Sequence, residues 1–299
     1  MNNPFSTTSD YNIKYSAYEY RKAANGRLYI RPKEDATFEV YKLAKSPELL
    51  EQMIIDGLNI GMLSIKKKSR TAIKAGIMNF VTNYGLLGFI TALPTTAKFV
   101  DYEAVYLPKN HFIKEETLPL LQYLEYFFPF KQLDISGKGQ KFHWTISDRS
   151  MMAIAIGMND YPESVIMSFQ REYAEPYEWL EQAFLDLAFT FYSAWLYCTE
   201  KDKLSEDELN LFRQGIAVFG GIAPTYHIEL LDQPTIVWEF HSLLRYLQMV
   251  FSLMVSDADH PLKLCPNCNK VFIAHNHKTV FCSPDCKNVF NVTKTRSKK

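Results

Sequence analysis

The chain has 299 residues, of which 47 % are hydrophobic and 14 % aromatic, and its 33 basic residues balance its 33 acidic residues. This composition excludes an intrinsically disordered chain, because a protein of this length and apolar content can bury most of its unfolded surface. The net charge indicates no partner, but the charge is unevenly distributed. Residues 263–299 contain eight basic residues and one acidic residue, whereas the rest of the chain contains 25 basic and 32 acidic residues.

Short extended segments precede the first helices. Residues 1–20 are polar and rich in tyrosine, and we expect them to be loosely ordered. Two short strands are predicted at residues 27–30 and 38–41. Ser46 and Pro47 then begin a helix, because Ser is a good N-cap and Pro is tolerated at the first helical position. The helical pattern continues to about Phe89, with breaks expected near Gly57, Gly61 and Gly85.

The second half of the chain is also predicted to be mostly helical. From Pro176 to about Thr199 apolar side chains recur every three or four residues and fill the other faces too, which predicts a helix buried nearly all round. Ser205 and Glu208 form a capping box at the start of the next helix. Extended segments are expected at residues 225–230 and 235–237, and a last long helix at about 239–255.

No segment has the features of a signal peptide or a membrane span. The N-terminus lacks a charged start and an apolar core, and the uncharged residues 75–97 contain Asn, Gly and Pro residues that interrupt a span. Four of the five cysteines lie in the last eighth of the chain, a placement typical of metal ligands in a reducing compartment. We therefore expect a cytoplasmic protein with no membrane role.

The four clustered cysteines have the spacing of a zinc site. Cys265 and Cys268 are separated by two residues, and Cys282 and Cys286 by three. Structural zinc is commonly bound by four thiolates in a tetrahedron. A C-x2-C pair suits this geometry because a tight turn aims both sulfurs at one point, and a C-x3-C pair suits the start of a helix. The sequence therefore predicts a structural zinc ion bound by these four residues.

The residues between the two cysteine pairs indicate a small finger. Residues 271–273 and 279–281 are predicted to pair as a hairpin whose polar tip contains His275 and His277. We expect both histidines to be solvated rather than to act as ligands. Knuckle, hairpin and helix together describe a treble-clef zinc finger. An iron site of the rubredoxin type is the lesser alternative, since four thiolates also bind iron.

The chain after the last cysteine contains five basic residues and no acidic one. Ser283 or Asp285 is expected to cap a helix here, and its dense positive charge predicts contact with DNA phosphates, with a solubilising tail as the alternative. A second basic cluster at residues 66–70 is expected to be a solvated helix face, with a phosphate-contacting patch as the alternative. Asn and Lys near the helix start are the candidates for reading bases. The candidate DNA-binding residues are Lys287, Asn288, Lys294, Arg296, Lys298 and Lys299.

The finger resembles a known family. Its C-x2-C pair, Phe272, the run 281–283, Cys286, Asn288 and the terminal Lys/Arg series resemble the CGNR-type zinc finger over about 35 residues. The family's Cys-Gly-Asn-Arg is replaced by residues 286–289, Cys-Lys-Asn-Val, so its Gly and Arg are absent. The resemblance implies a bacterial protein of the stress-induced transcription-regulator type, in which a mostly helical domain of unknown ligand precedes a DNA-binding finger.

We therefore predict two units. Residues 1–258 form a mainly helical domain with short strands, expected to fold on its own and to bind a small ligand or a protein partner or to form a homo-oligomer. Residues 259–299 form a small treble-clef zinc finger with a basic helix. The leading function is a DNA-binding transcription regulator. The alternatives are a zinc-stapled protein-interaction module and, as the weakest, an enzyme, although no G-x-S-x-G, P-loop or H-E-x-x-H motif is present.

Overall fold

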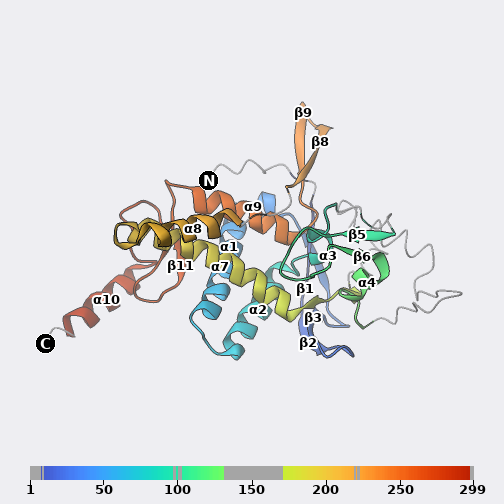
Figure 1. Cartoon of the computed structure of the whole chain (residues 1–299), viewed down its shortest axis with the longest axis horizontal. Coiled ribbons are helices and arrows are strands. Elements are labelled where there is room, and N and C mark those ends of the chain that lie inside the picture. The colour runs from blue at the N-terminus through green and yellow to red at the C-terminus, as the bar shows by residue number, and fades with distance from the viewer. Residues whose placement is uncertain are drawn as a thin grey trace, which may run out of the picture.

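Helices make up the body of the molecule and short strands lie around it, which confirms the mainly helical class (Figure 1). The structure is a computed structural model that describes Thr8, residues 10–96, Phe99, residues 103–130 and 171–218, Gly220 and residues 223–296. The helices in these residues are α1 (Pro47–Ile65), α2 (Arg70–Tyr84), α3 (Phe89–Ala92), α4 (Leu120–Glu125), α7 (Tyr177–Glu200), α8 (Glu206–Val218), α9 (Leu243–Ser256) and α10 (Pro284–Arg296), with short 3₁₀ helices η1 (Leu43–Lys45) and η3 (Lys201–Lys203).

The strands of the described residues pair into small antiparallel sheets. Sheets of two or three short strands are marginal alone, so their stability depends on packing against the helices. The pairs are β1 (Asn12–Tyr15) with β4 (Phe38–Tyr41), β2 (Tyr18–Lys22) with β3 (Leu28–Pro32), β3 with β7 (Glu175–Pro176), β5 (Ala104–Tyr106) with β6 (Thr117–Pro119), β8 (Thr225–Leu230) with β9 (Pro234–Glu239), and β10 (Leu262–Leu264) with β11 (Val271–Ile273).

The expectation that residues 1–20 are loosely ordered is wrong for most of the described part of this segment. Residues 12–15 and 18–22 form β1 and β2, and the rings of Tyr15 and Tyr18 are buried in the core. These two rings meet edge to face with their centroids 6.0 Å apart. Because aromatic rings bury a large apolar area, the tyrosines fix a segment whose other residues are polar.

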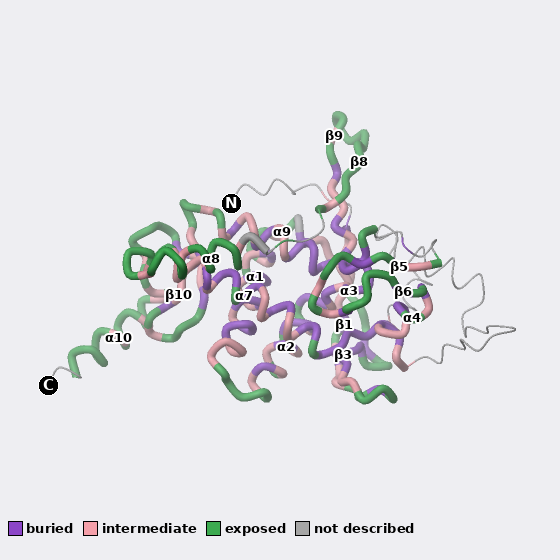
Figure 2. The backbone as a smooth tube through the Cα atoms, viewed as in Figure 1, coloured by how far each residue is buried: buried purple, intermediate pink, exposed green. Residues whose placement is uncertain are grey.

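The apolar core centres on α1 and α7, which lie along each other and form the most extensive contact between two elements (Figure 2). The predicted breaks at Gly57 and Gly61 are wrong, because α1 runs through both residues. A Cβ atom at Gly61 would lie 2.0 Å from the Phe184 carbonyl oxygen and 2.5 Å from the Ala188 Cβ. These glycines therefore permit a close helix approach. The predicted break at Gly85 is confirmed, since this residue ends α2 with φ at +89°.

Two buried charged side chains fix the short helix α3. The Glu175 carboxylate accepts hydrogen bonds from three consecutive backbone N–H groups at residues 87–89 and from the Tyr173 hydroxyl. Burial raises the pKa of Glu175 above its ordinary value, and these four hydrogen bonds to the carboxylate oppose that rise. At the other end of α3, the Arg245 guanidinium donates to the Ala92 carbonyl. Both ends of α3 thus have partners inside the core.

The remaining helix boundaries follow their capping residues. α7 spans the predicted range, and the capping box of α8 is confirmed: the Ser205 N–H donates to a Glu208 carboxylate oxygen over 2.8 Å, and the Glu208 N–H donates to the Ser205 hydroxyl over 3.4 Å. The last long helix, α9, begins later than predicted, at Leu243. Its N-cap is Ser242, whose hydroxyl accepts from the Arg245 N–H, and the residues up to 239 belong to β9.

Replacing Gly61 with Ala is expected to lower the free energy of unfolding by about 1–3 kcal/mol or more, because the added methyl group forces α1 away from α7. Gly215→Ala in α8 is the matched control. Nothing lies within 4 Å of the new Cβ there, so stability should stay unchanged or rise by up to about 1 kcal/mol. Urea unfolding of both variants measures the difference, and an unchanged midpoint for Gly61→Ala would contradict the close approach.

Candidate metal centre

The first cysteine pair lies in the turn that joins β10 to β11. The Cys265 N–H donates to the Lys270 carbonyl over 2.9 Å, and the Asn269 N–H donates to the Cys265 carbonyl over 2.8 Å. Asn269 adopts φ of +57°, a left-handed conformation that Asn tolerates better than most residues. The turn therefore has the tight form predicted from the spacing of Cys265 and Cys268.

The predicted pairing of residues 271–273 with residues 279–281 is wrong. β11 pairs instead with β10, the segment directly before the cysteine turn. The two connecting loops, residues 265–270 and 274–278, are about equally short, and the backbone hydrogen bonds within the first one align β10 with β11. Residues 279–281 are described and lie in no strand. The Lys263 ammonium binds this loop by donating to the Thr279 carbonyl over 2.9 Å.

The second cysteine pair stands at the start of α10. Cys282 precedes the helix and Cys286 lies in its first turn. Ser283, one of the two predicted caps, accepts a hydrogen bond from the Cys286 N–H over 3.2 Å. The Phe281 ring lies beside the Phe290 ring with the centroids 5.3 Å apart, so an aromatic contact also ties the first two turns of α10 to the preceding loop.

All four predicted ligands come together at one point. Their four sulfur atoms lie within 4.8 Å of one another, with Cys282 Sγ 3.6 Å from Cys268 Sγ and 3.5 Å from Cys286 Sγ. A tetrahedral ion with metal–sulfur bonds of about 2.3 Å places its sulfurs about 3.8 Å apart. Disulfide sulfurs lie at about 2.05 Å, and all four thiols are free. The arrangement therefore fits a metal ion bound by Cys265, Cys268, Cys282 and Cys286.

The surroundings of the sulfurs favour a thiolate at Cys265 and a thiol at Cys282. Burial by itself raises the pKa of Cys265, but hydrogen bonds from the backbone N–H groups of Cys268, Cys282 and Asn267 outweigh it and lower that pKa to about 6. Burial and the three neighbouring sulfurs raise the pKa of Cys282 to about 12. The four close thiols therefore differ in pKa, and a bound cation would displace their protons.

The hairpin of β10 and β11, here called the finger hairpin, is packed against helix α1. The Val271 N–H donates to Asn59 Oδ1 over 2.8 Å, and Asn59 Nδ2 donates to the Val271 carbonyl over 3.3 Å. Lys66 at the end of α1 donates to the Asn269 carbonyl over 2.6 Å. Val271 is 2 % exposed and, with Leu262, belongs to the apolar core of the body. The hairpin is therefore joined to the body by polar and apolar contacts.

Sequence analysis does not identify Asn59 as a functional residue, and it considers Lys66 only as part of a basic cluster. Asn has a low helix propensity, so its occurrence within the apolar pattern of α1 was a signal that its side chain has a partner. That partner lies more than two hundred residues away in the chain, and no local pattern indicates it. The independent folding of residues 1–258 stays a prediction.

The second basic cluster does not form the predicted helix face. Residues 66–69 form the connection between α1 and α2. Lys67, Lys68 and Arg70 are exposed, and Lys66 donates to the Asn269 carbonyl in the cysteine turn. Burial lowers the pKa of Lys66, the half-buried member of the cluster, and the nearby Cys268 opposes this effect. The alternative interpretation as a phosphate-contacting patch is therefore compatible with its position next to the finger.

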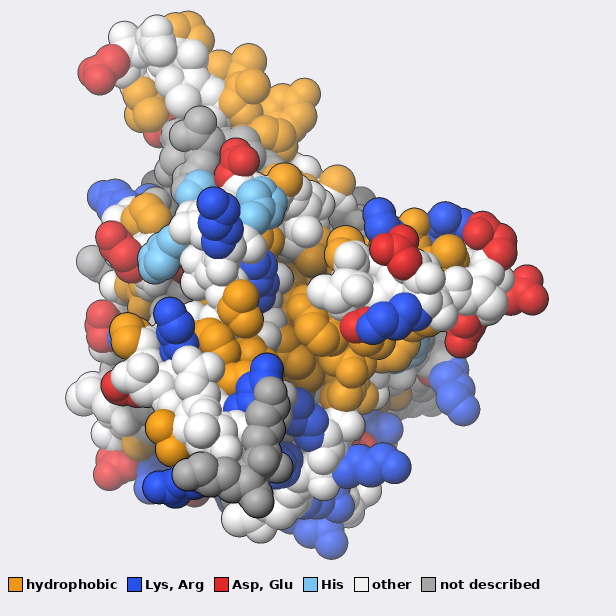
Figure 3. Space-filling model, turned by 90° about the vertical axis from the view of Figure 1, so that its left-hand side faces the viewer, with side chains coloured by type: hydrophobic (Ala, Val, Ile, Leu, Met, Phe, Trp, Pro, Cys, Tyr) orange, Lys and Arg blue, Asp and Glu red, His pale blue; other side chains and the backbone are white. Residues whose placement is uncertain are grey.

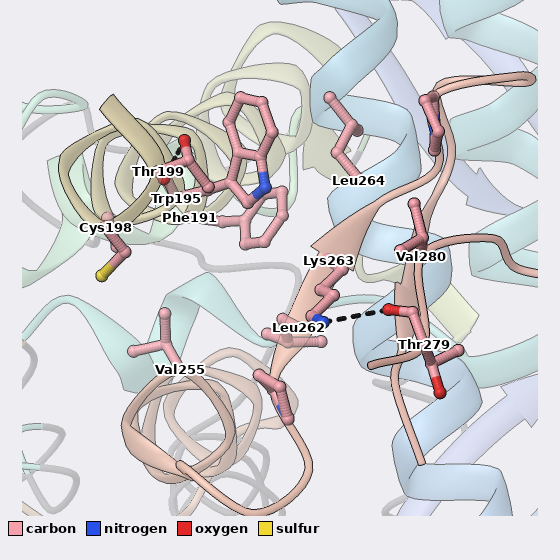
Figure 4. Close-up of a pocket in the computed structure, with 13 residues that line it drawn as sticks. Phe191, Trp195, Cys198, Thr199, Val255, Leu262, Lys263, Leu264, Thr279 and Val280 are labelled. Atoms are coloured by element: carbon pink, nitrogen blue, oxygen red, sulfur yellow. Dashed lines mark hydrogen bonds between the residues drawn. The ribbon is translucent and has the colours of Figure 1, made fainter. Parts of the chain in front are cut away.

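An apolar groove separates part of the finger from the body. It has a volume of about 420 Å³, which lies in the range of small-ligand pockets. Apolar surface is visible at this end of the molecule in Figure 3, and Figure 4 shows the groove with Lys263 bonded to Thr279 along one wall. Body and finger both contribute to it. The main apolar lining residues are Phe191, Trp195, Val255, Leu262, Leu264 and Val280.

The candidate DNA-binding residues lie on α10. Lys287, Asn288, Lys294 and Arg296 are exposed, whereas Lys298 and Lys299 lie outside the described residues. Lys287 and Lys294 are seven residues apart, so helical spacing places them on one face of α10. The only acidic residue of this helix is Asp285, in its first turn, where a negative charge suits the helix dipole. The exposed face therefore carries positive charge.

No protein-family model matches the chain, and neither a curated protein nor a solved structure matches it significantly. The resemblance to the CGNR-type finger therefore depends on the motif residues alone. Among the described residues, no helix combines the length and the apolar character required to cross a bilayer.

Replacing Cys265 and Cys282 together with Ser is expected to abolish metal binding and to loosen β10 and β11, because structural metal ions supply much of the folding energy of small fingers. Cys198→Ser is the matched control, since Cys198 is exposed on α7 outside the sulfur cluster. Elemental analysis and hydrogen exchange measure the two effects. Full metal content in the double variant would contradict the site.

Replacing Asn59 with Asp is expected to weaken the docking of the finger hairpin. The variant retains an acceptor for the Val271 N–H but turns a second oxygen toward the Val271 carbonyl, so that carbonyl loses its donor. Hydrogen exchange of residues 262–273 should accelerate about tenfold, for a loss of roughly 1.4 kcal/mol. Asn83→Asp, the same change at an exposed position of α2, should leave that exchange unaltered.

Proposed function

We propose that the four cysteines bind zinc in a finger of the treble-clef type and that this finger holds α10 in position to contact DNA. The support for zinc is the donor set: four thiolates without an open position are typical of structural zinc. Elemental analysis distinguishes this proposal from the iron alternative, because it identifies the bound metal directly. Absorption spectroscopy gives a second criterion, since an iron–thiolate site absorbs visible light and changes its spectrum on reduction.

One observation carries the DNA proposal: a basic, exposed helix begins at the metal site itself. Cys286 is a candidate ligand in the first turn of α10, so a bound ion would fix the direction of the helix. Lys287, Lys294 and Arg296 then extend along it, with Asn288 near the start as the candidate for reading a base. The rest of the chain is acidic overall, which disfavours general adhesion to DNA and confines contact to this end.

The neighbouring basic connection supports the same proposal. Lys and Arg side chains gather at the end of the molecule that carries the finger, as Figure 3 shows. Residues 66–70 contribute to this surface because Lys66 is bonded to the cysteine turn. Two basic segments from distant parts of the chain would thus face the phosphate backbone together. The resemblance to the CGNR-type finger extends the proposal to transcription regulation.

A second candidate function is a structural staple for protein interaction without DNA binding. It is favoured by the contacts of Asn59 and Lys66 with the finger, because these hold the hairpin against α1. In this alternative the metal ion closes the end of the body, and the basic helix only keeps the protein soluble.

The test is DNA binding by fluorescence anisotropy at several salt concentrations. We expect the logarithm of the affinity to fall with the logarithm of the salt concentration with a slope of about −2.7 if three phosphates are contacted. The triple variant Lys287→Ala, Lys294→Ala and Arg296→Ala should bind all sequences more weakly. Its slope should be flatter by about 0.9 for each phosphate that the variant no longer neutralises.

The matched control removes three exposed lysines from the opposite part of the body. The triple variant Lys22→Ala, Lys33→Ala and Lys109→Ala changes the net charge equally and should leave the salt slope unaltered. Metal content must be equal in all samples, so that loss of the finger is not mistaken for loss of DNA binding by α10. Equal retention of the wild type and the α10 variant at low salt would contradict the proposal and favour the staple.

A further inference from the structure

The hairpin of β8 and β9 projects from the body (Figure 1). Figure 2 shows most of its length as exposed, with buried residues only near its base. Within the described residues these two strands form a two-stranded sheet, and Thr8 makes an isolated parallel bridge to Trp238 at its base. A two-stranded hairpin is at best marginally stable in water, so this element requires a further contact along its length.

One face of the hairpin consists of apolar side chains. Residues directly opposite each other in an antiparallel pair share a face, and the cross-strand pairs on this face are Tyr226 with Trp238, Ile228 with Ile236, and Leu230 with Pro234. The exposed fractions are 62 % for Tyr226, 69 % for Ile228, 81 % for Leu230 and 50 % for Ile236. Trp238, at the base, is partly buried against the core. This solvent-exposed face of the hairpin is therefore apolar, whereas exposed strand faces are usually polar.

The opposite face is mostly polar. On it, His227 Nδ1 of β8 lies 3.0 Å from a Glu239 carboxylate oxygen of β9, so this contact joins the two strands to each other. Val237, on the same face near the base, is 2 % exposed. The apolar face therefore meets the core through Trp238 at its base, whereas its side chains further toward the tip are exposed.

We propose that this apolar face is an interface for a second copy of the same chain. The face contains no ionisable side chain apart from the Tyr226 phenol, so two identical faces related by a two-fold axis meet without like-charge repulsion. The four most exposed side chains alone offer on the order of 500 Å² per copy, taking roughly 200 Å² for a large side chain. Two copies would bury about 1,000 Å², which is the lower end of specific interfaces.

Charge disfavours the other occupants. The hairpin contains no Lys or Arg between residues 225 and 239, but it contains Glu229, Asp232 and Glu239. These carboxylates would repel the phosphates of nucleic acids and of anionic lipid surfaces. An uncharged apolar face matches an identical face best, because Glu229 and Glu239 of each copy lie on the side that points away from the contact and Asp232 lies in the turn at the tip.

Sedimentation equilibrium of the full-length, metal-loaded protein tests the proposal. We expect a monomer–dimer equilibrium between about 1 and 100 µM, as befits a small apolar interface. Ile228→Glu should weaken the dimer at least about 100-fold, because it places two unpaired carboxylates in the contact. Glu229→Lys, the adjacent residue on the polar face, is the matched control and should change the dissociation constant by less than about threefold.

A charge-pair experiment distinguishes a second copy from any other partner. Ile228→Glu and Ile228→Lys should each sediment as monomers, whereas an equal mixture of the two should associate again, because opposite charges then meet across the axis. Far-UV circular dichroism and metal content verify that both variants are folded. Failure of the mixture to associate while the wild type dimerises would overturn the face-to-face arrangement.

Hydrogen exchange provides a readout that needs no variant. Amides of residues 225–239 should be protected at high protein concentration and should exchange faster on dilution, while those of α1 and α7 remain protected at both. A wild type that sediments as a monomer at all concentrations would overturn the proposal. Binding of that monomer to neutral phosphatidylcholine vesicles through Ile228 would also overturn it, with lipid as the occupant.

Discussion

Helix α1 can lie against α7 only because Gly61 has no side chain. A methyl group there would lie 2.0 Å from a backbone oxygen of α7, and backbone atoms cannot move aside as the end of a flexible side chain can. With one face of α1 fixed in this way, a different part of the helix is available to the finger. Asn59 on that part binds the backbone of β11 on both its donor and its acceptor side. The position of the metal centre is therefore set by a close helix approach in the body.

The finger hairpin is held from two sides. Its strands have three residues each, too few for independent stability, and they are fixed at the cysteine turn and along β11. A metal ion would fix the turn through its thiolates, and Asn59 with the core contacts of Val271 fixes the strand. These two constraints act on different atoms of the same hairpin. The direction of α10, which starts at the same cluster of sulfurs, thereby becomes fixed relative to the body.

Spacing along the chain predicted the features whose cause is local. The cysteine pairs, the limits of α7 and the capping box of Ser205 depend on residues within a turn or two of one another, and all three are as expected. The role of Gly61, in contrast, was predicted wrongly because it depends on a distant partner. A glycine within a helix marks either a break or a close approach, and only the position of α7 decides between these for Gly61. The pairing of β11 is a different case, because both candidate partner segments lie within a few residues of it, and the hydrogen bonds of the cysteine turn favour β10.

The proposed DNA contact of α10 and the proposed dimer contact of the β8–β9 hairpin use different parts of the molecule, and this separation connects the two proposals. The basic helix α10 lies at one end of the molecule, whereas the acidic and apolar hairpin of β8 and β9 projects from another part of the body (Figure 1). Association through the hairpin would leave both basic helices exposed, because the two contacts use different surfaces. A dimer would then offer two fingers on one particle, and the binding of the first would raise the effective concentration of the second at the DNA. A helix that contacts only a few phosphates binds DNA weakly by itself at physiological salt, so self-association would raise the affinity of the proposed finger for DNA.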